Sequence, residues 1–246
     1  MNLDYDMISG TIIGWVRSTN EDCVEMLHEG MSLAVVADGL GGHPAGEVAS
    51  RMAVDAVCEN FAKWLPRGVP DDDILRDVMI DAMSLANRRV YEASHQRPKW
   101  AGMGTTLLAA YFQPDYFHVG HVGDSRLYGF RKGELVQLTT DHTLASELLS
   151  ANPDQEPPAS SHHQLQKAVG VDIACRPDFL SFPLRKNERY LLCTDGLSDL
   201  LDHNEIADIL TRYEQYPERC VDTLLDACMD QGAPDNVSLI LVFRIY

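Results

Sequence analysis

The chain has 246 residues, and its 37 acidic against 20 basic side chains give a formal net charge of −17 at pH 7. This charge argues against nucleic acid and against a membrane surface as partners, because binding to either relies on clustered Lys and Arg. The length fits one domain, no run of about 18 apolar residues predicts a membrane-spanning helix, and the acidic N-terminus lacks the apolar core of a signal peptide.

The first half of the chain predicts strands that are followed by two long helices. Residues 7–16 and 34–37 are apolar stretches with strand character. Apolar residues at helical spacing then predict a helix over 45–64 and a second helix that carries its apolar stripe to Val90. The three acidic residues Asp71–Asp73 suit the start of that second helix, where the helix dipole favours negative charge.

The second half predicts short strands joined by tight turns, which indicates mostly antiparallel pairing. Three helices accompany them: a short one over 144–149, one that Asn204 caps and that ends near Leu210, and one that begins at Pro217. The predicted strands cover 107–112, 116–123, 125–130, 134–138, 179–184, 190–194 and 237–243. Strands interleaved with helices in this way predict an α+β layered fold.

Acidic turns follow or precede four of the apolar strands, at Asp38, Asp124, Asp195 and Asp235. Each alone is an ordinary turn aspartate, because Asp favours turns by bonding its own backbone. Together they converge if the strand ends share one edge of a sheet. An all-oxygen ligand set suits Mg²⁺ or Mn²⁺, and we interpret Asp38 as the bridge between two such ions.

The segment from Arg17 to Asp22 adds two further acidic residues, Glu21 and Asp22, behind an arginine. One interpretation is a solvated turn with an internal ion pair. The other is an arginine that binds an oxyanion beside a carboxylate that binds a metal.

Seven short motifs in this order resemble those of the metal-dependent type 2C protein serine/threonine phosphatases, in particular their bacterial members. The resemblance covers nearly the whole chain. The motifs are Arg17-x-x-Asn20-Glu21-Asp22, Asp38-Gly39-x-Gly41-Gly42, Gly102-Met103-Gly104-Thr105-Thr106, Val122-Gly123-Asp124-Ser125-Arg126, Thr139-x-Asp141-His142, Thr194-Asp195-Gly196-Leu197 and Asp235-Asn236-Val237-Ser238.

The resemblance implies a four-layer α-β-β-α sandwich of two mostly antiparallel sheets, formed by residues 1–246 as a single catalytic domain. It also implies a site for two Mn²⁺ or Mg²⁺ ions. The implied roles are a bridge at Asp38, one ion held by Asp195 and Asp235, the other by Glu21 and the Gly39 carbonyl, a water-orienting role for Asp22, phosphate binding by Arg17, and a third ion at Asp124 with Asp195.

The implied activity is hydrolysis of phosphoserine and phosphothreonine in proteins by water that two metals activate, in opposition to a Ser/Thr kinase. Phosphorylated proteins, and the cognate kinase or its substrates, are the implied partners. Two alternatives stay open: a pseudophosphatase that binds phosphoproteins without turnover, and a phosphatase of small phosphoesters.

One position departs from the family pattern. Many eukaryotic relatives carry a leaving-group His directly after the Asp-Gly pair, where this chain has Leu40. His43 lies nearby, and we expect a packing or turn role for it. The segment from about 143 to 168 is predicted to be a flap insertion beside the site. Within it, His162 and His163 lack ligand spacing and are interpreted as solvated.

The six cysteines lack short paired spacings such as Cys-x-x-Cys, and several lie in apolar stretches. We therefore expect reduced, buried thiols and a cytoplasmic protein.

Overall fold

The computed structural model describes residues 5–27, 32–40, 45–64, 72–185 and 187–244. The predicted turn at Gly41, Gly42 and His43, and the side chains of Asp71–Asp73, lie outside what it describes. Among the described residues, no helix combines the length and apolar content that a membrane crossing requires.

Two five-stranded sheets form the centre of the molecule, and every strand pairing within them is antiparallel. The orders are β1-β10-β9-β6-β7 and β2-β3-β4-β5-β8. The strands are β1 (Tyr5–Ile12), β2 (Asp22–Leu27), β3 (Ser32–Asp38), β4 (Leu107–Phe112), β5 (Tyr116–Val122), β6 (Arg126–Arg131), β7 (Glu134–Gln137), β8 (Asp178–Pro183), β9 (Arg189–Cys193) and β10 (Val237–Arg244).

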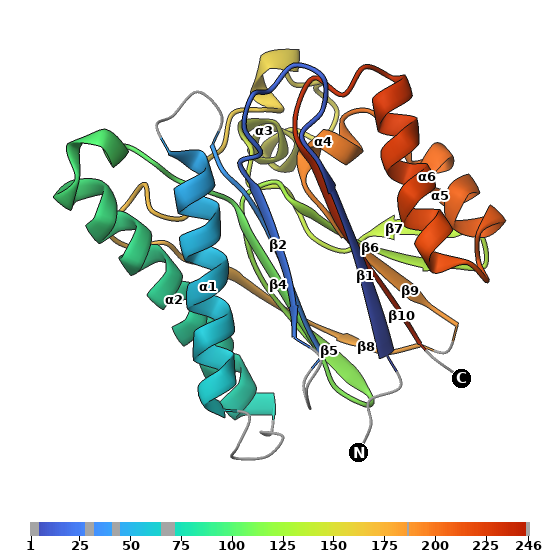
Figure 1. The fold of residues 1–246 in the computed structure, drawn as a ribbon, viewed down its shortest axis with the longest axis horizontal. Helices are drawn as coiled ribbons and strands as arrows, with labels where there is room; N and C mark the ends of the chain where they lie inside the picture. Colours follow the sequence, from blue (N-terminus) through green and yellow to red (C-terminus); the bar gives the residue numbers. More distant parts are fainter. Residues whose placement is uncertain (1–4, 28–31, 41–44, 65–71, 186, 245–246) are drawn as a thin grey trace.

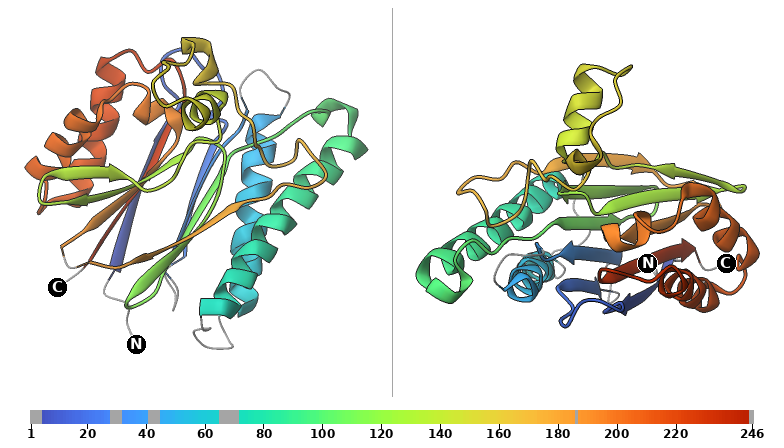
Figure 2. Two further views of the ribbon diagram at one scale, coloured as in Figure 1. Left: turned by 180° about the vertical axis from the view of Figure 1, so that it is seen from behind. Right: turned by 90° about the horizontal axis from the view of Figure 1, so that it is seen from above.

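Helices cover the outer face of each sheet (Figure 1). The helices α1 (Gly46–Trp64) and α2 (Asp72–Gln96) pack on the sheet that contains β3, and α5 (His203–Arg212) and α6 (Pro217–Asp230) pack on the other. The predicted four-layer α-β-β-α sandwich is confirmed. The helix α3 (Leu144–Ala151) belongs to the predicted flap segment and projects away from the layers (Figure 2).

Alternating side chains of the central strands explain why the layers hold together. In β3, Leu33, Val35 and Ala37 face α1 and α2, whereas Ala34 and Val36 face the second sheet. All five are fully buried. A strand that is covered on both faces reads as a continuous apolar run, which is why the sequence predicts β3 so clearly.

Strand register brings the acidic turns to one end of the sandwich. In the pairing of β2 with β3, Asp22 lies directly opposite Asp38. The strands β5 and β9 end just before Asp124 and Asp195, and β10 begins just after Asp235. In antiparallel sheets the end of one strand lies beside the start of its neighbour. The five acidic residues therefore meet at a common edge.

Three local predictions differ from the structure. The first strand ends at Ile12 because Gly14 adopts a left-handed conformation (φ +77°) that turns the chain. The strand β2 was not predicted, because it lies at a sheet edge and most of its side chains are only half-buried, which weakens the apolar pattern. A short helix, α4 (Asp195–Ser198), begins where only an acidic turn was expected.

The cap of α5 also needs correction. The N-cap is Asp202, whose carboxylate accepts hydrogen bonds from the backbone N–H groups of Asn204 and Glu205, at 2.8 and 2.9 Å. The Glu205 side chain accepts in turn from the Asp202 N–H at 2.8 Å. This reciprocal pair is a capping box, which makes Asp202 rather than Asn204 the residue that starts the helix.

We expect Asp202→Ala to lower the free energy of unfolding by about 1 kcal/mol, because two N–H groups lose their acceptor. The matched control is Asn204→Ala, which removes the side chain that the sequence suggested as the cap. Urea unfolding followed by circular dichroism measures both variants. A larger loss in Asn204→Ala than in Asp202→Ala would contradict the assignment.

Candidate active site

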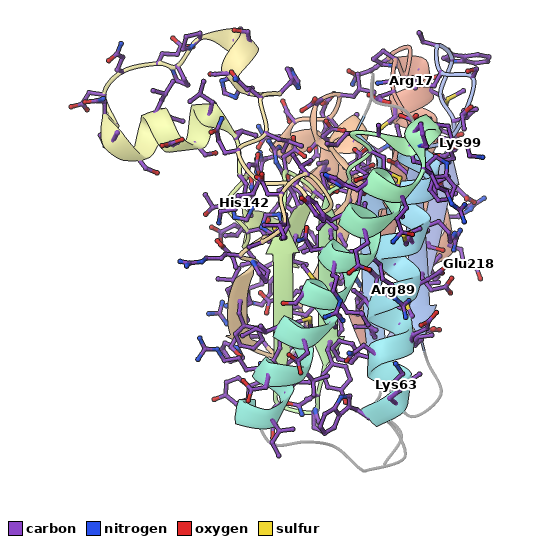
Figure 3. The ribbon with its side chains drawn as sticks, turned by 90° about the vertical axis from the view of Figure 1, so that its left-hand side faces the viewer. Arg17, Lys63, Arg89, Lys99, His142 and Glu218 are labelled. Carbon is purple, nitrogen blue, oxygen red and sulfur yellow. The ribbon has the colours of Figure 1, made fainter. Side chains whose placement is uncertain are left out.

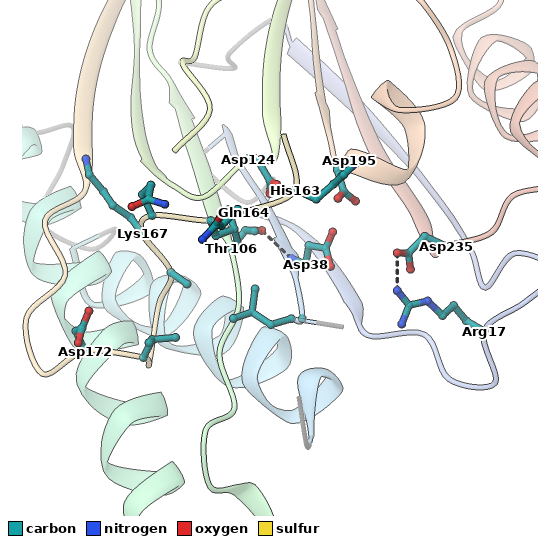
Figure 4. Close-up of a pocket in the computed structure, with 16 residues that line it drawn as sticks. Arg17, Asp38, Thr106, Asp124, His163, Gln164, Lys167, Asp172, Asp195 and Asp235 are labelled. Carbon is teal, nitrogen blue, oxygen red and sulfur yellow. Dashed lines mark hydrogen bonds and ion pairs between the residues drawn. The ribbon is translucent and has the colours of Figure 1, made fainter. Parts of the chain in front are cut away.

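A cavity of about 420 Å³ opens at the edge where the acidic turns meet (Figure 4). Six of the predicted site residues line it together: Arg17, Asp38, Gly39, Asp124, Asp195 and Asp235. Lys63 lies in the last turn of α1, and Figure 3 places Arg17 at the opposite end of the molecule from it. Strand ends and loops, rather than sheet or helix faces, thus form the site.

The backbone of Asp38 is held by two threonines of the predicted Gly102–Thr106 motif. The Asp38 N–H donates to Thr106 Oγ1 at 2.9 Å, and the Asp38 carbonyl accepts from the Thr106 N–H and from Thr105 Oγ1, both at 2.8 Å. Both threonines are buried. These bonds fix where the strand ends and therefore where the Asp38 carboxylate lies.

The carboxylates are crowded enough to oppose their own ionisation. Burial, and then the nearby Asp22 and Asp195 carboxyls, raise the pKa of Asp38 well above its ordinary value. Burial likewise raises the pKa of Asp22 and of Asp124 to about 7, with a further contribution from Asp195 in each case. Negative charge at this density requires bound cations if the groups are to be ionised at neutral pH.

One carboxylate oxygen of Asp22 is buried without a hydrogen-bond partner among the described residues. Its Oδ2 accepts from Thr194 Oγ1 at 2.9 Å, but its Oδ1 is buried and has no hydrogen-bond partner. A buried carboxylate oxygen without a partner is costly. The neighbouring carboxylates offer oxygen ligand atoms, so a hard divalent cation, or a water bound to such a cation, fits this position.

Glu21 lies behind the cavity, at the start of α1. A Cβ built on Gly46 would come within 2.9 Å of the Glu21 carboxyl carbon, and one on Gly39 would come within 2.4 Å of the Gly46 backbone. Position 39 accommodates only glycine because it packs against the Gly46 backbone, and a larger residue at position 46 would displace the Glu21 carboxylate. Burial raises the pKa of Glu21, and the charge of Arg17 opposes that shift.

Arg17 and Asp235 form an ion pair with a Nη2–Oδ2 distance of 2.6 Å (Figure 4). Both side chains are partly exposed to the cavity. One interpretation of the sequence was an ion pair within this turn, between Arg17 and Glu21 or Asp22. The structure instead pairs Arg17 with Asp235, from the far end of the chain. The guanidinium thus already supplies a positive charge beside one carboxylate of the cluster.

Asn236 fixes the segment that carries Arg17. Its side-chain amide donates to the carbonyls of Ile13 and Thr19 at 2.9 and 3.1 Å, and its Oδ1 accepts from the Glu21 N–H at 2.8 Å. The motif around Asp235 therefore contributes both an acidic side chain and the support for the arginine. Sequence reasoning noted this asparagine in the motif but assigned no role to it.

His142, from the Thr139-x-Asp141-His142 motif, supports the strand end beside Asp124. The imidazole Nδ1 of His142 accepts from the Gly123 N–H at 3.0 Å, and the backbone N–H of His142 donates to the Gly123 carbonyl at 2.8 Å. Its Nε2 faces Asp178 at 3.2 Å and Lys167 at 3.3 Å. His142 therefore joins the residue before Asp124 to the end of the predicted flap segment.

His163 and Asp199 are two site residues that sequence reasoning missed. His163 remains exposed, as interpreted, but its Nδ1 lies 3.4 Å from Asp199 Oδ2, and it lines the cavity. Ligand atoms of His163, Asp195 and Asp199 lie within 4.8 Å of one another. The signal for Asp199 was its spacing of four residues from Asp195, which places both on one face of a helical turn. Leu40, which replaces the family histidine, is also at the cavity wall.

An α-β-β-α sandwich with a carboxylate cluster at one edge defines a protein built to bind divalent cations through oxygen ligands. Comparison with known families agrees with this class. Residues 17–231 match the family described as Protein phosphatase 2C. The chain belongs to the protein phosphatase 2C family.

Curated relatives are bacterial. The chain is 34% identical over 234 residues to the serine/threonine protein phosphatase PstP of Mycobacterium tuberculosis, which covers 93% of this chain and 43% of PstP. It therefore spans less than half of that relative's length. It is 30% identical over 237 residues to the protein phosphatase PhpP of Streptococcus pneumoniae, with 94% of each chain covered.

The similarity extends to solved structures. The catalytic domain of the serine/threonine protein phosphatase PstP, solved in complex with two manganese ions, superposes with a TM-score of 0.83 at 31% identity. The superposition covers 98% of this chain and 99% of that one. The fold is thus shared along the whole catalytic domain of a manganese-binding relative.

The raised carboxyl pKa values predict a pH dependence of metal stabilisation. A folded-state pKa near 7 for Asp22, against 3.8 in the unfolded chain, stabilises the metal-free fold at low pH, and this contribution is lost as the pH rises to 7. A bound cation compensates the ionised carboxylates. We therefore expect the increase in Tm on addition of Mn²⁺ to be larger at pH 7.5 than at pH 5.

Differential scanning fluorimetry with Mn²⁺ and with EDTA measures this at each pH, so that titrations elsewhere in the protein cancel. Asp22→Asn should raise the Tm of the metal-free protein more at pH 7.5 than at pH 5, because it removes one of the crowded charges. An Mn²⁺-induced increase that is equal or larger at pH 5 would contradict the expectation.

Proposed function

We propose that this protein hydrolyses phosphoserine and phosphothreonine in proteins with the help of two divalent cations, Mn²⁺ or Mg²⁺, and so opposes a Ser/Thr kinase. Membership of the protein phosphatase 2C family and the names of the bacterial relatives support the reaction class. The observation that carries the proposal is the cavity. It places Arg17, which pairs with Asp235 and is partly exposed, beside a crowded cluster of carboxylates.

The proposed metal-binding roles follow the positions of the carboxylates. Asp38 would contact both ions because its carboxyl group lies beside Asp195 in the cavity (Figure 4), and the next residue, Gly39, also lines the cavity. The remaining proposed ligands are Asp195 and Asp235 for one ion, Glu21 and the Gly39 carbonyl for the other, and Asp124 with Asp195 for a third. When bound, the ions would activate water for attack on phosphorus and neutralise charge on the phosphoryl oxygens.

Arg17 would bind the phosphoryl oxygens of the substrate. A guanidinium can present two parallel N–H donors to a phosphate, whereas in the structure it donates to Asp235. If Asp235 instead binds a cation, Arg17 is free to turn to the substrate. The Oδ1 of Asp22, which lacks a hydrogen-bond partner within the part of the chain that the structure describes, would accept a hydrogen bond from an ordered water and so orient it.

Two alternatives make different predictions. A phosphoprotein-binding pseudophosphatase would bind phosphopeptides without releasing phosphate. Every proposed ligand except Glu21 lines one cavity, and Glu21 lies directly behind it, which argues against a pseudophosphatase. A phosphatase of small phosphoesters would show no preference for peptides. The ratio of kcat/KM for phosphopeptides to that for a small aryl phosphate separates this possibility from a protein phosphatase.

The segment 143–168 is proposed to be a flap that contributes to substrate choice, because His163 to Ala168 line the cavity wall. We also propose a cytoplasmic location. The six cysteines are free thiols in the structure, as expected from the sequence, which is consistent with a reducing compartment.

The proposal predicts phosphate release from a phosphothreonine peptide that depends on added Mn²⁺ or Mg²⁺. Asp38→Asn should lower the rate on the order of 100-fold or more, because even residues that only support metal ligands contribute 10- to 100-fold. Asp208→Asn, which removes an exposed acid on α5, is the control and should leave the rate unchanged.

A colorimetric phosphate assay with a titration of each metal measures these rates. Absence of release at every metal concentration, from folded protein that still binds the phosphopeptide, would overturn the enzyme assignment in favour of a binding protein.

A further inference from the structure

Three large apolar side chains are exposed on the segment immediately before Arg17. Trp15 is 70% exposed and Val16 is 72% exposed, and Ile13 is exposed as well. We call these three residues the apolar shelf. Single exposed apolar residues are common on protein surfaces, but a tryptophan and two aliphatic residues within four positions concentrate exposed apolar area in one short segment, and its burial by a ligand is favourable.

The shelf is held in place by hydrogen bonds to the end of α6 and the turn after it. The Trp15 N–H donates to the Ala233 carbonyl at 2.9 Å, and the indole Nε1–H donates to the Met229 carbonyl at 3.2 Å. The Ile13 carbonyl accepts from Asn236 at 2.9 Å. An aromatic side chain that is already fixed loses little conformational entropy when it binds a ligand.

Gly14 explains why the shelf lies so close to the site. Its φ is +77°, and a Cβ there would come within 2.4 Å of the Asp235 carbonyl and 2.5 Å of the Ala233 carbonyl. The segment therefore packs tightly against the residue that pairs with Arg17. Asp235 and Arg17 both line the cavity, so the Gly14 contact with the Asp235 carbonyl places the shelf segment beside the cavity, although no shelf residue lines it.

Other exposed apolar residues also gather at this cavity. Val171 lines the cavity next to Asp172, which lies across the cavity from Arg17 (Figure 4), and Ile173, close by in sequence, is exposed. Asn87 on α2 fixes this segment through hydrogen bonds to the Asp172 and Ile173 carbonyls, at 3.0 and 3.3 Å. Exposed apolar residues thus occur in two separate segments near the acidic centre.

The occupant is identified by the position of the shelf beside the cavity. If the phosphate of a phosphothreonine enters the cavity beside Arg17, the polypeptide on one side of it must cross the rim. An extended chain advances about 3.3 Å per residue, so a side chain within about three positions of the phosphothreonine can reach the shelf. A fixed indole flanked by aliphatic side chains matches an apolar side chain better than a charged one.

We propose that the apolar shelf of Ile13, Trp15 and Val16 is a substrate-docking subsite, which binds an apolar side chain next to the phosphorylated residue of a protein substrate. This inference rests on the proposed phosphatase function. It adds a preference for local sequence that the metal centre and Arg17 do not supply, because they contact only the phosphate.

A set of alanine-based phosphothreonine peptides, each with one Leu within about three positions of the phosphothreonine, tests the proposal. The wild-type protein should hydrolyse the best Leu peptide with kcat/KM about five- to tenfold above the all-alanine peptide, as expected for partial burial of one Leu. Trp15→Ala should abolish this preference, mainly through KM. Trp15→Leu should retain part of it.

Two controls separate docking from a structural role. Tyr216→Ala removes another exposed aromatic residue and should leave the preference intact. Tyr216 immediately precedes α6, whereas Trp15 contacts the other end of this helix, about 20 Å away. Mn²⁺-dependent hydrolysis of a small aryl phosphate should change less than twofold in Trp15→Ala, because that substrate does not reach the shelf.

Three outcomes would overturn the proposal. The first is a wild-type protein that shows no Leu preference while it hydrolyses the peptides. The second is an equal loss of aryl phosphate and peptide hydrolysis in Trp15→Ala, which would show that Trp15 only positions Arg17. The third is a preference that survives Trp15→Ala but is lost in Val171→Ser, which would place docking on the opposite wall. Absence of Mn²⁺-dependent phosphate release from both the peptides and the aryl phosphate in the wild type would instead contradict the proposed function itself.

Discussion

Electrostatic repulsion among buried carboxylates is the constraint on which the rest of this structure depends. Burial raises the pKa of Asp22, Asp38, Asp124 and Asp195, and repulsion from neighbouring carboxylates adds to this effect, with Asp199 the first such neighbour of Asp195. Full ionisation of such a cluster costs stability that bound cations would restore. The ion pair of Arg17 with Asp235 compensates one edge of it. The site is therefore arranged for divalent cations before any substrate arrives.

Apart from Thr194 and Arg17, which donate to the carboxylates of Asp22 and Asp235, the supporting side chains described above fix backbone groups. Thr105 and Thr106 hold the end of β3, Asn236 holds the segment that carries Arg17, and His142 holds the residue before Asp124. Their hydrogen bonds are directed at main-chain groups, so the carboxylate oxygens stay available to ligands. This division explains how short motifs far apart in the sequence act as one site. It also gives the predicted flap a physical link to the cluster, through His142 and Lys167.

Much of this arrangement could be predicted from the sequence, and the failures have physical causes. Strands buried on both faces, such as β3, have continuous apolar patterns, and the acidic turns at their ends predicted the carboxylate cluster that lines the cavity. The edge strand β2 and the short helix α4 have too few buried residues to produce a pattern. Asp199 and Trp15 were missed because their roles depend on contacts between segments distant in sequence, which periodicity does not report.

The most direct test of this account is the anomalous diffraction of a crystal grown or soaked with Mn²⁺ at neutral pH. The account predicts two strong anomalous peaks about 3.5–4 Å apart, with the Asp38 carboxylate between them, and Arg17 no longer paired with Asp235. A third peak beside Asp124 and Asp195 would extend it. Density that shows no ion at the cluster at millimolar Mn²⁺, with the Arg17–Asp235 pair intact, would contradict it.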